Sequence, residues 1–427
     1  MRYLLLGSSL RGLADVARSA VADGHEVMLY DAERPGAPDD LVGMVTVLDA
    51  TWSPSMLDGV DRVVTSPWFS ERVPPLSDVL ARGTDVITEA GYGLERLDIP
   101  YVAITGTNGK TTVTEVTAAM LQASGIDALA AGNVGTPLSG LDSEAAEVLV
   151  LELSSYQLRF IGSLDARAVA LLNIAPDHLD WHGSMDAYAD AKAEIAHGRR
   201  SPAPFAYNAD DARVLAIAAT AEPPTIACSG THLPDNGNGV DGDRLIVAGR
   251  SYPVGTDDAT YRFDLVVAAT LATAVGATDE GIEAVTSSFV PGPHRREHIG
   301  TIDGVVYVND SKATNPHATV AAAGVYDSVV LLAGGRNKGL DLAPLVGLPT
   351  VHALVPFGES GPDIASLAGV DAYPTMAEAF DAAVDLARAG DTVLLSPGCA
   401  SFDEFSSYEA RGDAFRDLVS GLRGEAA

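Results

Sequence analysis

The sequence predicts an α/β fold built from parallel β-strand–helix units and divided among about three domains. Short apolar runs bounded by Gly or Asp alternate with Ala-rich helical stretches almost throughout the chain, a pattern typical of parallel sheets covered by helices. The length of 427 residues, at about 150 residues per domain, gives the number of domains. Hydrophobic residues make up 47% of the chain and charged residues 20%, which indicates a packed fold and excludes disorder as its main state.

The first 95 residues begin this alternation. We expect a helix at residues 13–23 and strands at residues 3–7, 26–31, 63–66 and 85–88. The turn GSSLRG after the first strand keeps the spacing of a dinucleotide-binding G-x-G-x-x-G, but Ser9 replaces the middle glycine, so the turn alone is weak evidence. Asp31 ends the second strand, where an acid can meet a ribose or a base; a solvated loop acid is an equally good interpretation.

Two further blocks follow, the second after Pro100 and the third after the sequence PGPHRRE. In the second block we expect helices at residues 112–123 and 185–196, a turn-rich surface excursion at 235–243, and strands at 101–105, 148–153 and 169–174. In the third block we expect strands at residues 304–308, 328–332, 351–357 and 392–396, each followed by a helical run.

The charge balance restricts the partners of the protein. The net charge of −31 repels nucleic acid and anionic membranes, so we expect neither as a partner. No uninterrupted apolar run approaches the roughly 18 residues of a membrane-spanning helix. The two cysteines cannot form a disulfide framework in a chain of this length, and we expect a cytoplasmic location.

Lysine is nearly absent. Only four of the 27 basic residues are lysine, and three of these four lie beside Gly, Asp or Asn at predicted strand ends; the four are Lys110, Lys192, Lys312 and Lys338. A lysine can act as a compact point charge or as a nucleophilic amine, and an arginine can do neither. The pattern favours functional roles over chance survival on solvated helices.

The strongest motif is GTNGKTT at residues 106–112, between a predicted strand and a predicted helix. Its glycines let backbone N–H groups turn toward phosphates, and the helix N-terminus favours negative charge. Lys110 can reach terminal phosphate oxygens and Thr111 can bind Mg²⁺. Only two residues separate Gly106 from Gly109, which departs from the common G-x-x-x-x-G-K-T spacing. The motif predicts a nucleotide triphosphate site.

Acidic and imidazole side chains follow the neighbouring strands. Glu152 ends the run VLVLE, where a carboxylate beside a phosphate loop usually holds the metal of the nucleotide. Asp177 and His178 end the next strand and could add a second metal ligand, whereas Asp180 and His182 are better explained as ordinary loop residues.

Lys192 lies on the predicted helix after that strand. An ammonium group aimed at a metal site would repel Mg²⁺, so two interpretations remain. Either Lys192 faces solvent, or its neutral amine has added CO₂ to form an anionic carbamate with two oxygens suited to a hard cation.

The third block carries its polar residues in loops at strand ends. NDSKATN holds Asp310 and Lys312, AGGRNKG holds Lys338, and the segment after the last strand holds Ser396, Ser401 and Tyr408. The C-terminal strand ends of open α/β sheets bind ligands. Cys399 has no apparent histidine partner, so we interpret it as a small buried filler rather than a nucleophile.

Together these motifs resemble the Mur ligases, in order and over nearly the whole chain. The residues that carry the resemblance are GTNGKTT, ELSSYQL, the Asp177–His178 pair followed by Lys192, PHRRE, NDSKATN and SPGCASFDEF. The resemblance implies a Rossmann-like UDP-binding domain (1–95), a central P-loop ATPase-like domain (96–292) and a C-terminal Rossmann-like, amino-acid-binding domain (293–427). It also implies ATP-dependent addition of D-glutamate to UDP-N-acetylmuramoyl-L-alanine through an acyl phosphate, by a monomer that makes peptidoglycan precursors.

The resemblance also implies roles for single residues. Thr111 and Glu152 would bind the Mg²⁺ of the nucleotide, His178 and a carbamylated Lys192 would bind a second metal, and Lys110, His178 and Lys192 would be catalytic. The ATP site would comprise Gly106, Thr107, Asn108, Gly109, Lys110, Thr111, Thr112, Arg295, Asp310 and Lys312. The glutamate site would comprise Thr314, Lys338, Ser401, Phe402 and Tyr408. Leu10, Arg11 and Asp31 would face the uridine, and Asn133 the muramoyl part.

Several positions depart from the family pattern: Ser9, Trp68, Phe402, Tyr408 and the pair Phe263–Asp264, which stands where we expect His–Asn and puts an adenine contact in doubt. Two other functions remain open. One is a related ligase that adds L-glutamate or another amino acid to a muramoyl peptide, or glutamate to a folate, although a folate enzyme lacks the first domain. The other is a non-catalytic nucleotide-binding paralogue, which would be expected to lose Glu152 or Lys192, and both are present.

Overall fold

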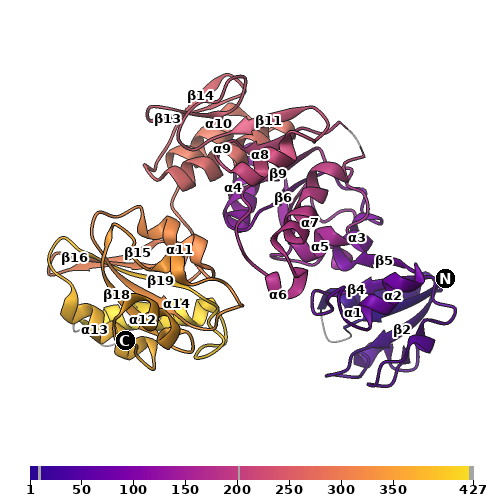
Figure 1. The fold of residues 1–427 in the computed structure, drawn as a ribbon. Helices are drawn as coiled ribbons and strands as arrows, with labels where there is room; N and C mark the ends of the chain where they lie inside the picture. Colours follow the sequence, from indigo (N-terminus) through magenta and orange to yellow (C-terminus); the bar gives the residue numbers. More distant parts are fainter. Residues whose placement is uncertain (8–10, 201, 423–427) are drawn as a thin grey trace. The chain divides into compact units, whose positions relative to one another are not determined.

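The computed structural model describes residues 1–7, 11–200 and 202–422, which form two compact units. Unit 1 comprises Met1–Ile174 and Trp181–Phe289, and unit 2 comprises Ala175–Asp180 and Val290–Ala427. Both units are α/β structures in which helices cover largely parallel sheets (Figure 1). The predicted fold class is confirmed at this level.

The first sheet of unit 1 has five parallel strands in the order β3-β2-β1-β4-β5. Its elements are β1 (Arg2–Leu6), α1 (Arg11–Ala22), β2 (Glu26–Tyr30), β3 (Thr46–Val47), β4 (Arg62–Thr65), α2 (Leu76–Arg82), β5 (Asp85–Thr88) and α3 (Glu89–Leu94), with 3₁₀ turns at Asp39–Leu41 and Pro54–Leu57. Apolar side chains on the two faces of the sheet form two separate cores. The alternation expected for residues 1–95 is therefore present, with element ends shifted by one or two residues.

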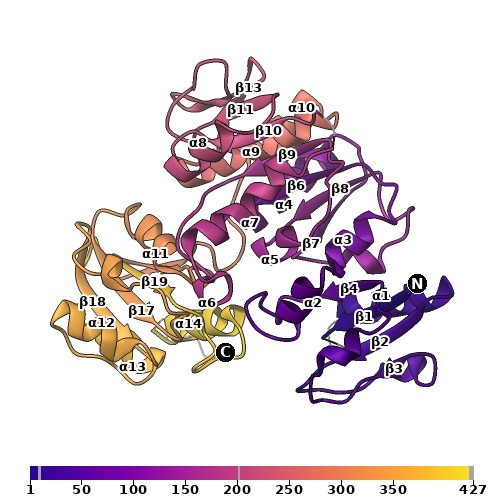
Figure 2. The same cartoon turned by 45° about the vertical axis from the view of Figure 1, so that its right-hand side comes forward.

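The second sheet of unit 1 has six parallel strands in the order β11-β10-β9-β6-β8-β7 (Figure 2). Its strands are β6 (Tyr101–Thr105), β7 (Ala128–Gly132), β8 (Val148–Glu152), β9 (Ala168–Leu171), β10 (Phe205–Asn208) and β11 (Thr225–Cys228). Its helices are α4 (Lys110–Ala123), α5 (Ser155–Arg159), α6 (Leu179–His182), α7 (Met185–His197), α8 (Ala212–Ala218), α9 (Ala259–Ala274) and α10 (Asp279–Ser287), with a 3₁₀ turn at Leu138–Gly140. The α6 helix begins in the segment that belongs to unit 2.

The excursion expected at residues 235–243 has turns at both ends, and it also contains a short strand that was not predicted. Three short antiparallel strands, β12 (Gly239–Asp241), β13 (Arg244–Val247) and β14 (Arg250–Pro253), form a separate sheet. Gly242 and Gly249 have φ angles of 62° and 76° in the two tight turns between them. Glycine adopts such positive φ angles without strain, so the glycines of this region are explained by tight hairpin turns.

The sheet of unit 2 has the order β15-β16-β19-β17-β18, and only the edge strand β15 is antiparallel. Its elements are β15 (Glu297–Ile302), β16 (Val305–Asn309), α11 (Pro316–Ala323), β17 (Val329–Gly334), β18 (Val351–Phe357), α12 (Gly361–Ala368), α13 (Met376–Leu386), β19 (Thr392–Gly398) and α14 (Tyr408–Leu422). The prediction that each strand is followed by a helical run is wrong for β17, which leads only to a 3₁₀ turn at Ala343–Leu345. Glycines and Pro344 interrupt helix formation there.

No helix in the described ranges is long and apolar enough to cross a membrane. Within each parallel sheet the C-terminal ends of the strands lie along one edge. The loops that leave β6, β8 and β9 therefore share one edge in unit 1, and those that leave β16, β17 and β19 share one edge in unit 2.

Candidate active site

The loop GTNGKTT connects β6 to the N-terminus of α4, as predicted. Gly109 caps α4 with a φ of 85°, and a Cβ at this position would lie 2.9 Å from Oδ1 of the buried Asp264. Lys110 Nζ donates to the carbonyl oxygens of Gly106 and Thr107, at 2.9 Å each. The loop thus combines a lysine ammonium with N–H groups at a helix N-terminus, which is the arrangement that binds phosphate.

Asn173, which the sequence analysis did not single out, holds this loop. Thr107 N donates to the Asn173 carbonyl at 2.9 Å, and Asn108 N donates to Asn173 Oδ1 at 2.8 Å. In return Asn173 Nδ2 donates to the Asn108 carbonyl at 3.0 Å. The sequence signal that could have identified Asn173 is its position just after a predicted strand, two residues beyond Leu171.

Glu152 is the last residue of β8, next to the strand that carries the phosphate loop, and its side chain is 2% exposed. Oε1 accepts a hydrogen bond from Asn133 Nδ2 at 2.7 Å. Oε2 is buried and has no hydrogen-bond partner among the described residues. Because an uncompensated buried carboxylate oxygen is costly, this atom fits a cation as its missing partner.

The fit to Mg²⁺ does not require a cage of protein ligands. Within residues 1–7, 11–200 and 202–422, no group of three or more His, Cys, Asp or Glu side chains could hold a metal ion. Mg²⁺ usually binds one or two protein ligands and completes its shell with phosphate and water oxygens. Glu152 together with the Thr111 hydroxyl at the start of α4 is a donor set of this kind.

Lys192 is buried on α7, with 1% of its surface exposed, so the solvent-facing interpretation is wrong. Its Nζ donates to the Gly106 carbonyl at 2.8 Å and lies 3.4 Å from Thr105 Oγ1. It also lies 4.8 Å from the ring centroid of Tyr188, whose hydroxyl is 3.0 Å from Thr107 Oγ1. Tyr188, one helical turn before Lys192, was missed by the sequence analysis, although the i, i+4 spacing places both on one face.

A cavity of about 140 Å³ lies between the first and second sheets of unit 1. It is lined by Ser66, Glu89, Asn133, Tyr156, Gln157 and Trp181, among others. Glu89 accepts hydrogen bonds from Ser139 N and Ser139 Oγ at 2.7 Å each, and burial raises the pKa of its carboxyl. Asn133 lines the cavity while it contacts Glu152, so the cavity and the phosphate-loop edge share a residue.

The predicted uridine contacts are described only in part. Leu10 and Ser9 lie outside the described residues, and of Arg11 only the backbone, at the start of α1, lies within them. Asp31 follows β2, and its Oδ1 accepts hydrogen bonds from Glu33 N at 3.1 Å and Arg34 N at 3.0 Å. Asp31 therefore shapes the loop at the end of β2.

In unit 2 Asp177 contacts the loop that carries Lys338. Lys338 Nζ lies 2.7 Å from Asp177 Oδ1, and Asn315 Nδ2 donates to Asp177 Oδ2 at 3.4 Å. His178 has a φ of 54°, which is uncommon for a residue other than glycine and marks a sharp turn in this segment. The Lys338 ammonium thus already has a carboxylate neighbour.

The loop NDSKATN is held from several sides. Asp310 accepts from Ser396 Oγ at 2.8 Å and from Arg296 N at 3.1 Å. Lys312 Nζ lies 3.9 Å from the ring centroid of Tyr408. Arg295 lies between His294 and Arg296, both at positive φ. The structure therefore places the predicted residues Asp310, Lys312 and Tyr408, and the backbone beside Arg295, around one strand end.

The loop after β19 is built around a buried arginine that the sequence analysis missed. Arg411 donates to Ser311 Oγ at 3.0 Å, to the Ser311 carbonyl at 2.9 Å and to the Cys399 carbonyl at 3.1 Å. Burial lowers the pKa of its guanidinium to about 10. Arg411 thereby ties the loop after β16 to the loop after β19.

The other predicted residues of these loops differ in exposure. Ser401 is buried and accepts a hydrogen bond at its carbonyl from Phe405 N, Thr314 is half-buried, and Phe402 is 62% exposed. Cys399 is 1% exposed, and burial raises the pKa of its thiol to about 11. The interpretation of Cys399 as a buried filler is confirmed.

Comparison with known proteins gives consistent similarities. The family model described as the Mur ligase middle domain matches residues 104–233, and the one described as the Mur ligase, glutamate ligase domain matches residues 294–399. A protein of Frankia casuarinae named UDP-N-acetylmuramoylalanine--D-glutamate ligase is 38% identical over 453 residues, which cover 99% of this chain and 94% of that protein. A protein of the same name from Thermobifida fusca is 36% identical, over 96% of each chain.

Solved structures share the fold at lower identity. The chain is similar to MurF from Acinetobacter baumannii, with a TM-score of 0.62, 15% identity, and coverage of 99% of this chain and 93% of that chain. It is also similar to Escherichia coli FolC in complex with DHPP and ADP, with a TM-score of 0.58, 19% identity, and coverage of 78% and 92%.

Proposed function

Because the chain belongs to the Mur ligase family, we propose that it adds D-glutamate to UDP-N-acetylmuramoyl-L-alanine in an ATP-dependent step of peptidoglycan precursor synthesis. The observation that carries the chemistry is the pairing of a phosphate loop with the buried Oε2 of Glu152 on the adjacent strand, which no described residue hydrogen-bonds. That pairing is suited to a nucleotide triphosphate and its metal.

A carboxylate does not react with an amine until one of its oxygens becomes part of a leaving group. In the proposed reaction a carboxylate oxygen of the L-alanine moiety attacks the γ-phosphorus of ATP, and ADP leaves. The glutamate amine then attacks the acyl phosphate, loses a proton, and phosphate leaves. Lys110 and the N–H groups at the start of α4 would hold and neutralise the phosphates in both steps.

Thr111 and Glu152 would hold Mg²⁺, which neutralises charge on the transferred phosphoryl group when bound. We infer that His178 and a carbamate on Lys192 serve a second metal. Burial favours the neutral form of an amine, which is the form that adds CO₂, and Lys192 is 1% exposed. The carbamate would exchange a buried cation for an anion beside the phosphate loop.

The residues of unit 2 would bind the other reactants. Arg295, Asp310 and Lys312 would contact ATP, and Thr314, Lys338, Ser401, Phe402 and Tyr408 would form the glutamate site. Lys338 has three N–H donors, one of which faces Asp177, so donors remain for a substrate carboxylate.

The UDP-sugar would bind in unit 1. Leu10, Arg11 and Asp31 would face the uridine and Asn133 the muramoyl group, since Asn133 lines the cavity between the two sheets. Each of the proposed domains, residues 1–95, 96–292 and 293–427, contains its own sheet of wholly or mainly parallel strands. We propose that the enzyme acts as a monomer in the cytoplasm.

The experiment is phosphate release from ATP with each substrate omitted in turn. Release that requires both UDP-N-acetylmuramoyl-L-alanine and D-glutamate supports the proposal, and equal rates with L-glutamate would reject the stereochemical part. ATP binding without release under any combination would indicate a nucleotide-binding paralogue. Release with a folate in place of the UDP-sugar would indicate the folate-type ligase.

A further inference from the structure

The phosphate loop is bordered by a second buried acid, which comes from a different element than Glu152. Asp264 lies on α9 and is 3% exposed, and its Oδ1 and Cγ lie 2.9 Å and 3.6 Å from the position that a Cβ on Gly109 would occupy. Leu172, which follows β9, approaches the same position to 3.2 Å. Because β9 and β8 flank β6 and α9 packs on β9, Asp264 borders the loop from the β9 side and Glu152 from the β8 side.

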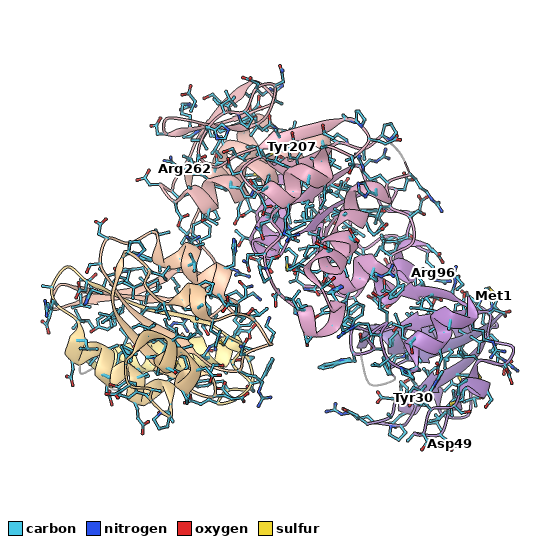
Figure 3. All side chains as sticks on the ribbon, in the orientation of Figure 1. Met1, Tyr30, Asp49, Arg96, Tyr207 and Arg262 are labelled. Carbon is cyan, nitrogen blue, oxygen red and sulfur yellow. The ribbon has the colours of Figure 1, made fainter. Side chains whose placement is uncertain are left out.

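This carboxylate lies on a mainly apolar helix. The structure describes α9 throughout, and Asp264 is the only charged residue among the buried residues of the helix. Arg262, the one basic residue of α9, is labelled in Figure 3; its guanidinium donates to the Thr256 carbonyl and to Asp257 Oδ1, at 2.8 Å each, before the start of the helix. Burial of a carboxylate is costly, so a negative charge at this position calls for a functional explanation.

Hydrogen bonding by Asp264 does not by itself explain the charge. A side chain that only had to accept N–H groups at Oδ1 could equally be asparagine, whose amide has nearly the same size and keeps this acceptor. The feature that asparagine lacks is the negative charge. That charge lies beside a loop whose helix N-terminus and Lys110 ammonium are arranged to bind phosphate, so it opposes the binding of a polyanion there.

We propose that Asp264 is a specificity-determining residue that makes the phosphate loop select the magnesium complex of ATP over metal-free ATP. The inference rests on the proposed function for the identity of the nucleotide and its metal. Metal-free ATP is more negative than its magnesium complex by the charge of the ion, so a fixed carboxylate penalises the metal-free form more strongly. Water screens this repulsion only weakly at a buried site. In contrast to Glu152, which would bind the ion, Asp264 would act through its charge alone.

The test measures two dissociation constants of the full chain by calorimetry, one for ATP in excess EDTA and one for ATP in excess Mg²⁺. Asp264→Asn removes the charge and keeps the shape of the side chain. We expect the constant for metal-free ATP to fall at least about fivefold and the constant for the magnesium complex to fall only about twofold. The matched control Asp257→Asn removes a fully exposed acid just before α9 and should leave the ratio of the two constants unchanged.

Equal factors for the two forms of ATP, or weaker binding of metal-free ATP by Asp264→Asn, would overturn the inference. Asp264→Ser, a second neutral variant, must shift the ratio in the same direction, and it decides the question if circular dichroism shows that Asp264→Asn is unfolded. ATP binding needs neither the UDP-sugar nor glutamate. A shifted ratio in a protein that forms no product would therefore reject the proposed function alone, whereas a wild type that binds neither form of ATP would reject both.

Discussion

Two buried groups at the phosphate loop are better explained by function than by stability. Glu152 has one carboxylate oxygen without a hydrogen-bond partner in the described part of the chain, and Lys192 places an amine against the Gly106 carbonyl in the interior. Groups of this kind cost free energy unless a ligand or a modification completes them. Their substitution should therefore affect activity and stability in different directions.

Glu152→Gln should raise the Mg²⁺ concentration for half-maximal activity by at least about tenfold, because one charged ligand is lost. Its free energy of unfolding should stay equal or increase, since a neutral amide replaces an uncompensated buried charge and the contact with Asn133 Nδ2 is kept. Magnesium titration and urea unfolding measure the two effects. Glu147→Gln, an exposed acid just before the same strand, is the matched control. A Glu152→Gln enzyme with wild-type magnesium dependence would argue against the metal site.

Lys192→Ala should lose most activity and regain part of it with small carboxylates such as propionate. An added anion can occupy the space of a carbamate, whereas an alkylamine can occupy only the space of an ammonium. Circular dichroism verifies that the variant is folded. Rescue by propylamine instead of propionate would show that the active form of Lys192 is an unmodified amine.

Residues with local chemical signals could be predicted from the sequence, and residues that act through the backbone could not. Lys110 and Glu152 stand at strand ends in recognisable patterns. Asn173 and Arg411 act by hydrogen bonds to backbone carbonyl or amide groups of distant loops. Every residue has these backbone groups, so the sequence of the contacted loop does not indicate such a bond. Asp177 was predicted beside a metal, and its contact with Lys338, 161 positions away, had no sequence signal.

At the scale of elements, the loops at the C-terminal edge of the unit 2 sheet depend on α14. Arg411 lies on this helix, and its guanidinium donates hydrogen bonds to backbone carbonyls of two loops that carry predicted substrate contacts. Water would otherwise have to satisfy these carbonyls. The opposite edge of the sheet is held differently, by the buried Asp391 just before β19, which contacts Ser328 just before β17 and His352 of β18. The two edges can be tested separately.

Arg411→Met should lower the free energy of unfolding by about 2–5 kcal/mol, because it leaves the Ser311 and Cys399 carbonyls without their donors. In the folded fraction the KM for glutamate should rise more than the KM for the UDP-sugar. Arg416→Met on the same helix removes contacts with Glu297 and Asp413 that are partly exposed, and should cost about 1 kcal/mol or less. Equal costs for the two variants would refute the special role of Arg411.

Asp391→Asn should flatten the acid limb of the stability profile. Burial alone would raise the pKa of Asp391, but hydrogen bonds from Ser328 Oγ, Arg388 N and His352 outweigh it and hold the pKa below its ordinary value. A carboxyl with a depressed folded pKa stabilises the fold fully above its unfolded pKa, and this stability is lost as the pH falls through the folded value. Urea unfolding between about pH 2 and 7 should therefore show less pH dependence below about pH 4 in the variant. Identical acid limbs in both proteins would contradict this assignment.

Element prediction succeeded where a strand is apolar and parallel. The runs that became β6, β8 and β19 are buried on both faces and continuous in sequence. The edge strand β15 has two isoleucines separated by Gly and Thr, and β12 is three residues long, so neither produces an apolar run. Their pairing depends on hairpin turns more than on their own residues.

At the scale of the whole molecule, the chain divides its chemistry between two compact units. Unit 1 holds the phosphate loop, Glu152, Lys192 and the cavity, and unit 2 holds the strand-end loops with Lys312 and Lys338. The alternation of strands and helices predicted these regions in order. It could not predict that residues 175–180 belong to unit 2, because they continue directly from β9 of unit 1.

Isotope transfer tests whether ATP activates a substrate carboxylate at the phosphate loop. UDP-N-acetylmuramoyl-L-alanine labelled with ¹⁸O in its carboxylate is incubated with enzyme, ATP and D-glutamate, and the released phosphate is analysed by mass spectrometry. The carboxylate oxygen that attacks phosphorus leaves with it, so the account predicts one ¹⁸O atom in each phosphate and one in each amide product. Unlabelled phosphate formed together with the amide product would contradict it.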